Sequence, residues 1–185
     1  EIVALRGDPP KGAARFTPHP EGFRDACELI GALADMNQFT IRVGAYPEVH
    51  PEAASMQAGI EWLKRKIDAG ADEAITQFFF EAETFFRFRD AAAAAGITAP
   101  IIPGILPIEN WQGTQRFAKS CGTSIPAWLS DAFAKAERDG REDLLATAVA
   151  TELCAALVED WAEHLHFYTL NKPEMTRDIC MALGL

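Results

Sequence analysis

Short apolar runs alternate along the chain with longer segments in which apolar residues recur every three or four positions. The runs cover residues 2–5, 41–45, 74–80, 101–106 and 166–170. Each run is nearly continuous in hydrophobicity and rich in β-branched or aromatic residues, which predicts strands covered on both faces, as in parallel sheets. Each intervening segment is long enough for a crossover helix, so the pattern predicts five β-α units.

The predicted helices have recognisable faces and ends. One is expected to open at Pro51, where a missing N–H costs nothing, and to end at Gly70. Its apolar stripe consists of Met56, Ile60, Leu63 and Ile67. The other helices are expected over residues 22–34, 81–96, 111–120, 127–135, 143–164 and 174–183.

A repeated parallel β-α pattern leaves two architectures, an open doubly wound sheet and a closed (β/α)8 barrel. The glycine-rich fingerprint of the open class is absent, and polar residues gather just after several strand ends, where a barrel builds its active site. A complete barrel has eight strands in about 250 residues. We therefore expect a single domain over residues 1–185 that holds strands 4 to 8 of a TIM barrel, with the N-terminal units missing. The start at Glu1, directly before an apolar run and without an initiator Met, supports this expectation.

The composition is that of an ordinary globular domain, with 49% hydrophobic and 24% charged residues. The net charge of −10 argues against a nucleic-acid partner, but not against an anionic cofactor held by a few local cations. The four cysteines are widely spaced without a C-x-x-C pair, so we expect no metal site, no disulfide framework and a reducing cytoplasm. No signal peptide or membrane-spanning run is recognisable.

The first candidate site follows the first predicted strand. Arg6 has a planar donor fork suited to phosphate or carboxylate, and Gly7 lets the backbone approach a ligand closely. Asp8 can hydrogen-bond a polar ring or stabilise a positive charge. The alternatives are an ordinary Arg–Asp turn pair and the Arg-Gly-Asp adhesion tripeptide, against which the lack of secretory signals argues.

The second candidate site follows the second predicted strand. Tyr46 is suited to pack flat against an aromatic ring, and His50 precedes a helix N-terminus, a place that favours anions. Lys66 lies further along the same helix in the trio Lys64-Arg65-Lys66. The alternatives are an ordinary loop histidine and a solvated basic face.

Polar and aromatic residues near three later strand ends complete the candidates. Gln77 interrupts a strictly apolar strand, and its amide both donates and accepts hydrogen bonds, which suits a pterin or amide edge. The alternative is a structural hydrogen bond inside the barrel. Phe117 follows the fourth strand, and Tyr168 and Lys172 belong to the last strand and its end. Each of these is weak alone.

Taken together, these segments resemble the methylenetetrahydrofolate reductase family. The strings LRGD, YPEVHPEA, ITQFFF, IIPGILP, IPAW and HFYTLN occur in the order found in that family, over essentially all 185 residues. The resemblance implies a barrel that holds FAD at the C-terminal ends of its strands and reduces 5,10-methylenetetrahydrofolate to 5-methyltetrahydrofolate. NAD(P)H reduces the flavin and leaves before the folate binds, which is a ping-pong sequence in one shared site. The resemblance also implies a cytoplasmic enzyme of one-carbon metabolism and methionine biosynthesis that forms homo-oligomers at full length.

The resemblance carries residue roles onto the matching positions of this chain. The residues expected to hold FAD are Arg6, Gly7, Asp8, Tyr46, His50 and Lys66. Asp8 is also expected to be the catalytic acid beside the flavin and pterin rings, where it stabilises a cationic iminium of the folate. The residues expected to bind substrate are Asp8, Gln77, Phe117, Tyr168 and Lys172.

Departures from the family pattern qualify these expectations. The family's catalytic glutamate lies on the first barrel strand and has no counterpart here, so the fragment alone is expected to be inactive, and neither Glu48 nor Glu109 is assigned to that role. Lys172 replaces the usual arginine, which keeps the charge but loses the bidentate fork. Gly59 stands where the family often has an acidic residue that contacts the FAD ribose. The competing interpretations are a non-catalytic truncated product and another folate-binding barrel, such as a methyltransferase domain.

Overall fold

The strands form parallel sheets in which each strand pairs with its neighbour along the chain. The structure, a computed structural model, describes residues 1–7, 9, 12 and 16–184. Its four-stranded sheet has the order β1-β2-β3-β4, made of β1 (Ile2–Ala4), β2 (Ile41–Ala45), β3 (Glu73–Thr76) and β4 (Ile101–Ile102). In a second sheet, β5 (Gly104–Ile105) pairs with β6 (His166–Phe167). All of these pairs are parallel.

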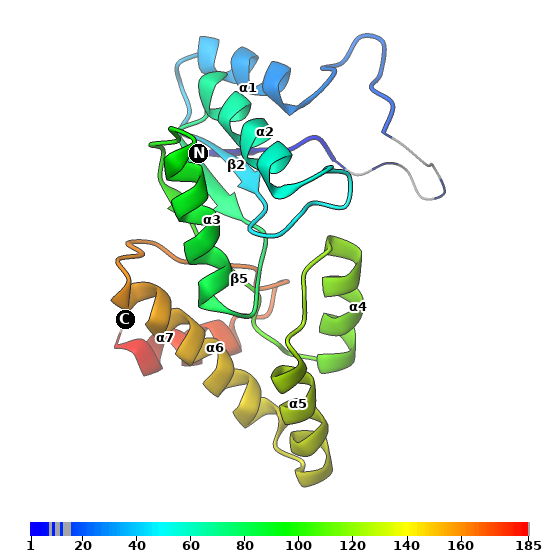
Figure 1. Cartoon of the computed structure of the whole chain (residues 1–185), viewed down its shortest axis with the longest axis vertical. Coiled ribbons are helices and arrows are strands. Elements are labelled where there is room, and N and C mark those ends of the chain that lie inside the picture. Colours follow the sequence, from blue (N-terminus) through cyan, green and yellow to red (C-terminus); the bar gives the residue numbers. More distant parts are fainter. Residues whose placement is uncertain (8, 10–11, 13–15, 185) are drawn as a thin grey trace.

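The helices connect successive strands. The first three are α1 (Ala26–Asp35), α2 (Met56–Asp68) and α3 (Ala82–Ala94). Between β5 and β6 lie α4 (Trp111–Cys121), α5 (Ala127–Asp139) and α6 (Glu142–Glu159), and α7 (Glu174–Leu183) follows β6. Figure 1 shows α1, α2 and α3 beside the four-stranded sheet in the upper half of the molecule, with α4 to α7 in the lower half.

The strand order favours a barrel over an open doubly wound sheet. In a doubly wound sheet the order reverses at a switch point, whereas here β1, β2, β3 and β4 follow one another without reversal. Since β4 and β5 are separated only by Pro103, the chain from 101 to 105 pairs with β3 at its start and with β6 at its end. The predicted α/β class with a parallel sheet is confirmed.

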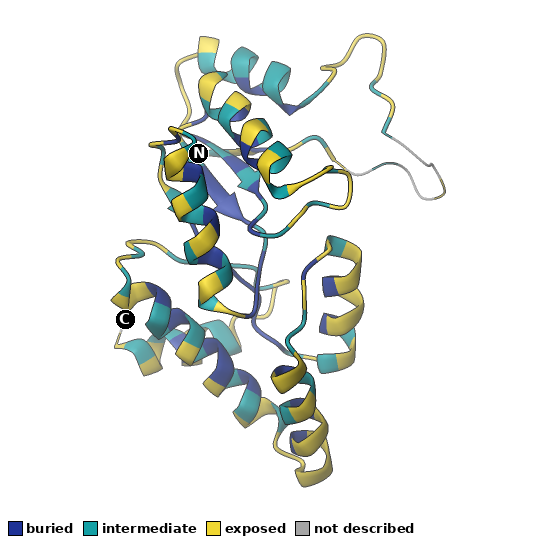
Figure 2. Cartoon of the chain, in the orientation of Figure 1, coloured by how far each residue is buried: buried dark blue, intermediate teal, exposed yellow. Residues whose placement is uncertain are grey.

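Buried apolar side chains hold the helices against the strands. One cluster joins the sheet to the first three helices through Val43, Ala74, Ile30, Ile60 and Ala92. Beyond β3, Phe78 and Phe80 enter a cluster with α4 and α5, while Phe79 enters another with α6 and α7. Successive side chains of an extended segment point to opposite sides, which explains this division. In Figure 2 the strands are largely dark blue, and the outward faces of the helices are yellow.

The start of α2 differs from the sequence prediction because a cap overrides the proline signal. The helix begins at Met56 and not at Pro51. Ser55 is the N-cap, and its hydroxyl accepts a hydrogen bond from the Ala58 N–H at 3.2 Å. A serine cap satisfies one of the helix's unpaired N–H groups, which a proline at the first position cannot do.

The predicted start of α1 and the predicted end of α6 are wrong. α1 begins four residues later than position 22, because the Asp25 carboxylate caps it by accepting from the Glu28 N–H at 3.1 Å. α6 ends at Glu159 and not at residue 164. Just beyond that end, Trp161 has a left-handed φ of 69°, which stops the right-handed helix.

Pro103 divides the predicted strand 101–106 into β4 and β5. Proline has no N–H to donate to a neighbouring strand. The next N–H, of Gly104, donates to the Thr76 hydroxyl at 2.8 Å and not to a strand carbonyl. The predicted strands 74–80 and 166–170 are also shorter than expected, since regular pairing ends at Thr76 and Phe167. The segments beyond these two ends contribute to the site described next.

Candidate functional site

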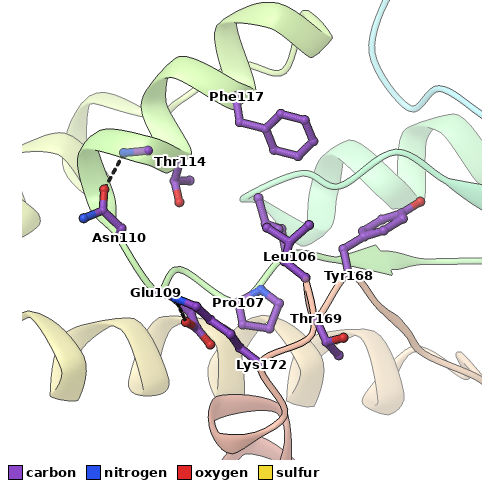
Figure 3. Close-up of a pocket in the computed structure, with 11 residues that line it drawn as sticks. Leu106, Pro107, Glu109, Asn110, Thr114, Phe117, Tyr168, Thr169 and Lys172 are labelled. Atoms are coloured by element: carbon purple, nitrogen blue, oxygen red, sulfur yellow. Dashed lines mark hydrogen bonds and ion pairs between the residues drawn. The ribbon is translucent and has the colours of Figure 1, made fainter. Parts of the chain in front are cut away.

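A cavity of about 240 Å³ opens where β5, α4 and the segment after β6 meet. Its lining residues are Leu106, Pro107, Glu109, Asn110, Gly113, Thr114, Phe117, Tyr168, Thr169, Leu170 and Lys172. Figure 3 shows Thr114 and Phe117 on α4 on one side and Tyr168, Thr169 and Lys172 on the segment after β6 on the other, with Lys172 directed toward Glu109. Apolar walls with a few polar groups are usual for small-molecule sites. The structure therefore brings together Phe117, Tyr168 and Lys172, three of the residues expected to bind substrate.

Tyr168 is held in the cavity wall by β3. Its hydroxyl donates to the Thr76 carbonyl oxygen at 2.8 Å, and burial raises the pKa of the phenol to about 12. Gly104 makes this contact possible, because a Cβ there would lie 2.1 Å from the same carbonyl oxygen and 2.8 Å from Tyr168 Cε2. Tyr168 thus offers its ring to the cavity while its hydroxyl remains protonated and bound to the backbone.

An ion pair lies at the edge of the cavity. Lys172 Nζ lies 2.7 Å from Glu109 Oε2, and the two side chains are 61% and 25% exposed. The hydrogen bond to Glu109 raises the pKa of the Lys172 ammonium. An ion pair with this much water contact is weak, so an anionic ligand can compete with Glu109 for Lys172.

The turn before Lys172 is strained. Leu170 and Asn171 have φ values of 49° and 63°, in the left-handed region that residues other than glycine seldom adopt. The Lys172 N–H closes the turn by donating to the Thr169 carbonyl oxygen at 2.8 Å. Backbone strain of this kind clusters at functional sites. Here it places Leu170 against the cavity and brings Lys172 to Glu109.

Phe117 is presented by a well-capped helix. Asn110 is the N-cap of α4, and its side-chain oxygen accepts from the Gly113 N–H at 2.6 Å. Phe117 lies two turns further along, is 41% exposed and stacks on Phe78 with ring centroids 5.3 Å apart. An exposed phenyl ring that is supported by a buried one is suited to stack against a planar ligand.

A smaller hollow joins the predicted flavin-side residues to Gln77. Its lining residues are Tyr46, Pro47, Glu48, Val49, Gln77, Phe78, Cys121, Gly122 and Thr123. The Tyr46 and His50 rings meet edge to face, with centroids 4.4 Å apart. Arg6 forms an ion pair of 2.9 Å with Glu52, which joins the segment after β1 to the segment after β2. The predicted FAD residues Arg6, Tyr46 and His50 therefore come from adjoining segments.

Gln77 continues the strand ladder and then folds onto its own backbone. Its N–H donates to the Ala45 carbonyl oxygen at 2.8 Å, and its side-chain Oε1 accepts from the Phe78 N–H at 3.0 Å. The amide oxygen is thus used within the protein. A ligand in this hollow would meet the amide nitrogen, which is a donor.

Lys66 contacts the sheet from α2. Its side chain is 8% exposed, and Nζ donates to the Gly44 carbonyl oxygen at 2.7 Å. Burial lowers the pKa of the ammonium to about 8. The structure therefore places this predicted FAD residue at a helix–sheet contact, on the residue of β2 that lies two positions before Tyr46.

Two predicted site residues, Gly7 and Asp8, lie next to each other after β1 in the sequence. Asp8, the expected catalytic acid, lies outside the described residues. Gly7 has a φ of 33°, and apart from its chain neighbours no atom of the described residues lies within 4 Å of the position that a Cβ would take.

Some cavity residues are absent from the sequence prediction. Glu109 follows a strand end, which is a usable signal, but its partner Lys172 is 63 positions away and the pairing cannot be read from a pattern. Leu106 and Thr114 carry no comparable signal, because they have the same appearance as ordinary strand and helix residues.

A sequence model of the family described as methylenetetrahydrofolate reductase matches residues 1–184. The chain belongs to the methylenetetrahydrofolate reductase family. The family resemblance of the sequence strings is thereby confirmed.

Curated relatives match over the whole chain. The 5,10-methylenetetrahydrofolate reductases of Salmonella typhimurium and Escherichia coli are each 45% identical to it, over all of this chain and 60% of their own length. Methylenetetrahydrofolate reductase (NADH) 1 of Arabidopsis thaliana is 38% identical, and the match covers 33% of that protein. The chain thus spans about 60% of the length of these bacterial relatives.

A solved structure shares the fold. It is an uncharacterized protein from Clostridium thermocellum described as binding two copies of 5-methyl-5,6,7,8-tetrahydrofolic acid. The TM-score is 0.62 at 20% identity, over 85% of this chain and 57% of that one. At this identity the likeness concerns the arrangement of helices and strands alone.

Within residues 1–7, 9, 12 and 16–184, no group of three or more His, Cys, Asp or Glu side chains is arranged to hold a metal ion. None of the helices in that part of the chain combines the length and the apolar composition needed to cross a membrane.

Proposed function

We propose that this member of the methylenetetrahydrofolate reductase family provides the folate-binding side of a flavin-dependent reductase. The reaction is the reduction of 5,10-methylenetetrahydrofolate to 5-methyltetrahydrofolate with NAD(P)H as the electron donor. The observation that carries the proposal is the cavity of about 240 Å³ with Phe117, Tyr168 and Lys172 in its wall. Aromatic walls suit a pterin or benzoyl ring, and Lys172 suits a folate carboxylate.

The residues on the flavin side fit a phosphate-bearing flavin in their chemistry. Arg6 offers a guanidinium that is 33% exposed, and Gly7, which follows it, has no side chain to keep a ligand from the backbone. Tyr46 and His50 supply an aromatic surface in the adjoining segment. Bound FAD would supply hydride transfer between NAD(P)H and the folate. Arg6 would bind its phosphate in place of Glu52, and Lys66 would add positive charge behind β2.

The described side chains have distinct tasks in this proposal. Phe117 stacks on the ring of the bound substrate, and Gln77 donates from its amide nitrogen to the folate or the nicotinamide. Tyr168 stays protonated and keeps the wall in place. Asp8 is proposed to face the folate cation and stabilise it. NAD(P)H and the folate are proposed to use the site in turn, in a ping-pong sequence.

We also propose that the six short strands correspond to strands 4 to 8 of a TIM barrel, with β4 and β5 as two parts of one strand. Two observations support this. The bacterial relatives are longer, and β1 has an edge that lacks a partner in the described residues, where Val3 of the strand is 48% exposed and Leu5 just after it is 62% exposed. The polypeptide that would add the remaining units is called the full-length polypeptide below.

The proposed function is tested by the two half-reactions of the full-length polypeptide under anaerobic conditions. NAD(P)H is expected to bleach the absorbance of bound flavin, and 5,10-methylenetetrahydrofolate is expected to restore it. A polypeptide that binds folate but neither retains nor rebinds flavin would contradict the proposal and favour a folate-binding barrel without redox chemistry.

The role of Asp8 is tested in the same assay. Asp8→Asn is expected to slow flavin reoxidation by the folate more than flavin reduction by NAD(P)H, because the carboxylate is proposed to face the folate cation. Equal losses in both half-reactions would contradict that role.

A further inference from the structure

Glu48 connects the segment after β2 to the loop between α4 and α5. Its two carboxylate oxygens accept from the Ser124 N–H at 3.1 and 3.0 Å, across 76 positions of sequence. Hydrogen bonds from an N–H to an ionised carboxylate are stronger than those between neutral groups. Glu48 therefore fixes the loop at one position, the Ser124 N–H.

Close packing reinforces this contact. Gly122, the C-cap of α4, has a left-handed φ of 74°. A Cβ at this position would lie 3.2 Å from Pro51 Cγ and 3.4 Å from the Val49 carbonyl oxygen. The loop 121–124 is thus pressed against the segment 47–51, and only a residue without a side chain fits without displacing its neighbours.

The same loop is held by the end of β3. The Thr123 hydroxyl donates to the Phe78 carbonyl oxygen at 3.2 Å, and Thr123 is 8% exposed. Phe78 in turn supports the ring of Phe117, which lies one turn before the end of α4. The position of Phe117 in the cavity therefore depends on where the loop 121–124 fixes the end of its helix.

We propose that Glu48 is a positioning residue that sets Phe117 against the bound substrate and links the segment carrying Tyr46 and His50 to the folate cavity. The proposal rests on the proposed function of the cavity, since it assigns Phe117 to the ring of the folate. Glu48 acts through its hydrogen bonds to Ser124 and not through its charge on the flavin or the substrate.

Variants of the full-length polypeptide separate these two modes of action. Glu48→Ala removes both hydrogen bonds, and we expect the KM for 5,10-methylenetetrahydrofolate to rise at least about tenfold, the lower end of what losing a hydrogen bond to a charged acceptor costs. The kcat changes little, because Phe117 positions the substrate and exchanges no proton. Glu48→Gln keeps an amide oxygen that accepts from Ser124, so its KM is expected near the wild-type value.

A matched control and a double variant complete the design. Glu81→Ala removes another long-range carboxylate contact, to Trp128 Nε1 at 3.2 Å on α5, and is expected to leave the KM unchanged. In a Phe117→Ala background, Glu48→Ala is expected to have no further effect on the KM, since the two residues act in series. A Glu48→Gln variant as impaired as Glu48→Ala, or additive effects with Phe117→Ala, would overturn the proposal.

Amide hydrogen exchange tests the contact without an activity measurement. The Ser124 N–H of the wild-type protein is expected to exchange slowly and to lose that protection selectively in Glu48→Ala, and to keep most of it in Glu48→Gln. Rapid exchange at Ser124 in the wild type would overturn the proposal even if Glu48→Ala does not fold. Slow exchange in a protein that fails to reduce folate would instead contradict the proposed function and leave the Glu48–Ser124 contact standing.

Discussion

Gly104→Ala is the substitution for which the structure gives the sharpest expectation. The new Cβ would lie 2.1 Å from the Thr76 carbonyl oxygen and 2.8 Å from Tyr168 Cε2. The first neighbour is backbone of β3, so it cannot rotate away, and the N–H of Gly104 itself is held by the Thr76 hydroxyl. Relief requires β3 and β5 to separate, which costs about 3 kcal/mol or more as an overpacking strain.

The expected loss is measurable against a matched glycine. The bacterial relatives, of which this chain covers 60%, have about 300 residues, and for a protein of that size about 3 kcal/mol lowers the melting temperature by roughly 5 °C. Gly59 lies inside α2, and apart from the nearby backbone of that helix and the chain neighbours no atom of the described residues lies within 4 Å of the position that a Cβ would take, so Gly59→Ala is expected to stabilise the helix by about 0.5–1 kcal/mol. Urea and thermal unfolding of the full-length polypeptide compare the two variants. The reasoning is refuted if Gly104→Ala melts within about 2 °C of the wild type.

Two further substitutions test the electrostatics and the local structure near the site. Burial lowers the pKa of Lys66 from 10.5 to about 8, because the charged form is disfavoured in the folded state. Between pH 8 and 10.5 the unfolded chain therefore binds more protons than the folded one. The free energy of unfolding of the wild type should rise over this range, relative to that of Lys66→Met, by up to about 3 kcal/mol. Urea unfolding at several pH values checks this, and a pH-independent difference between the two proteins would argue against the buried ammonium. Asn110→Ala removes the cap of α4 and should cost about 1 kcal/mol of unfolding free energy, while a variant as stable as the wild type would show that the Gly113 N–H finds another acceptor.

The hydrophobic pattern predicted the order and type of the elements because parallel strands buried on both faces leave continuous apolar runs. The pattern failed to predict the ends of elements that are set by a single polar or cyclic side chain. Ser55 starts α2 in place of Pro51, and Pro103 interrupts a strand that the apolar run continues through. The start of α2 and the break at Pro103 depend on individual hydrogen bonds. The spacing of apolar residues along the sequence carries no information about them.

The candidate site was predictable in part. The family resemblance assigned Phe117, Tyr168 and Lys172 to the substrate, and the parallel pair β5 and β6 brings the segments that follow these strands together around one cavity. The contacts that organise the cavity were not predictable. The Tyr168 hydroxyl reaches the backbone of β3 across 92 positions, and Glu48 reaches Ser124 across 76. Such pairs depend on the three-dimensional path of the chain, which no local motif encodes.

We propose that the cavity between α4 and the segment after β6 binds the folate, and a crystal structure of the full-length polypeptide with 5-methyltetrahydrofolate tests this directly. We expect the ligand to lie in this cavity with a ring stacked on Phe117 and with Tyr168 still bound to the Thr76 carbonyl oxygen. A ligand bound elsewhere, with this cavity unoccupied, would show that the folate site lies in another part of the protein.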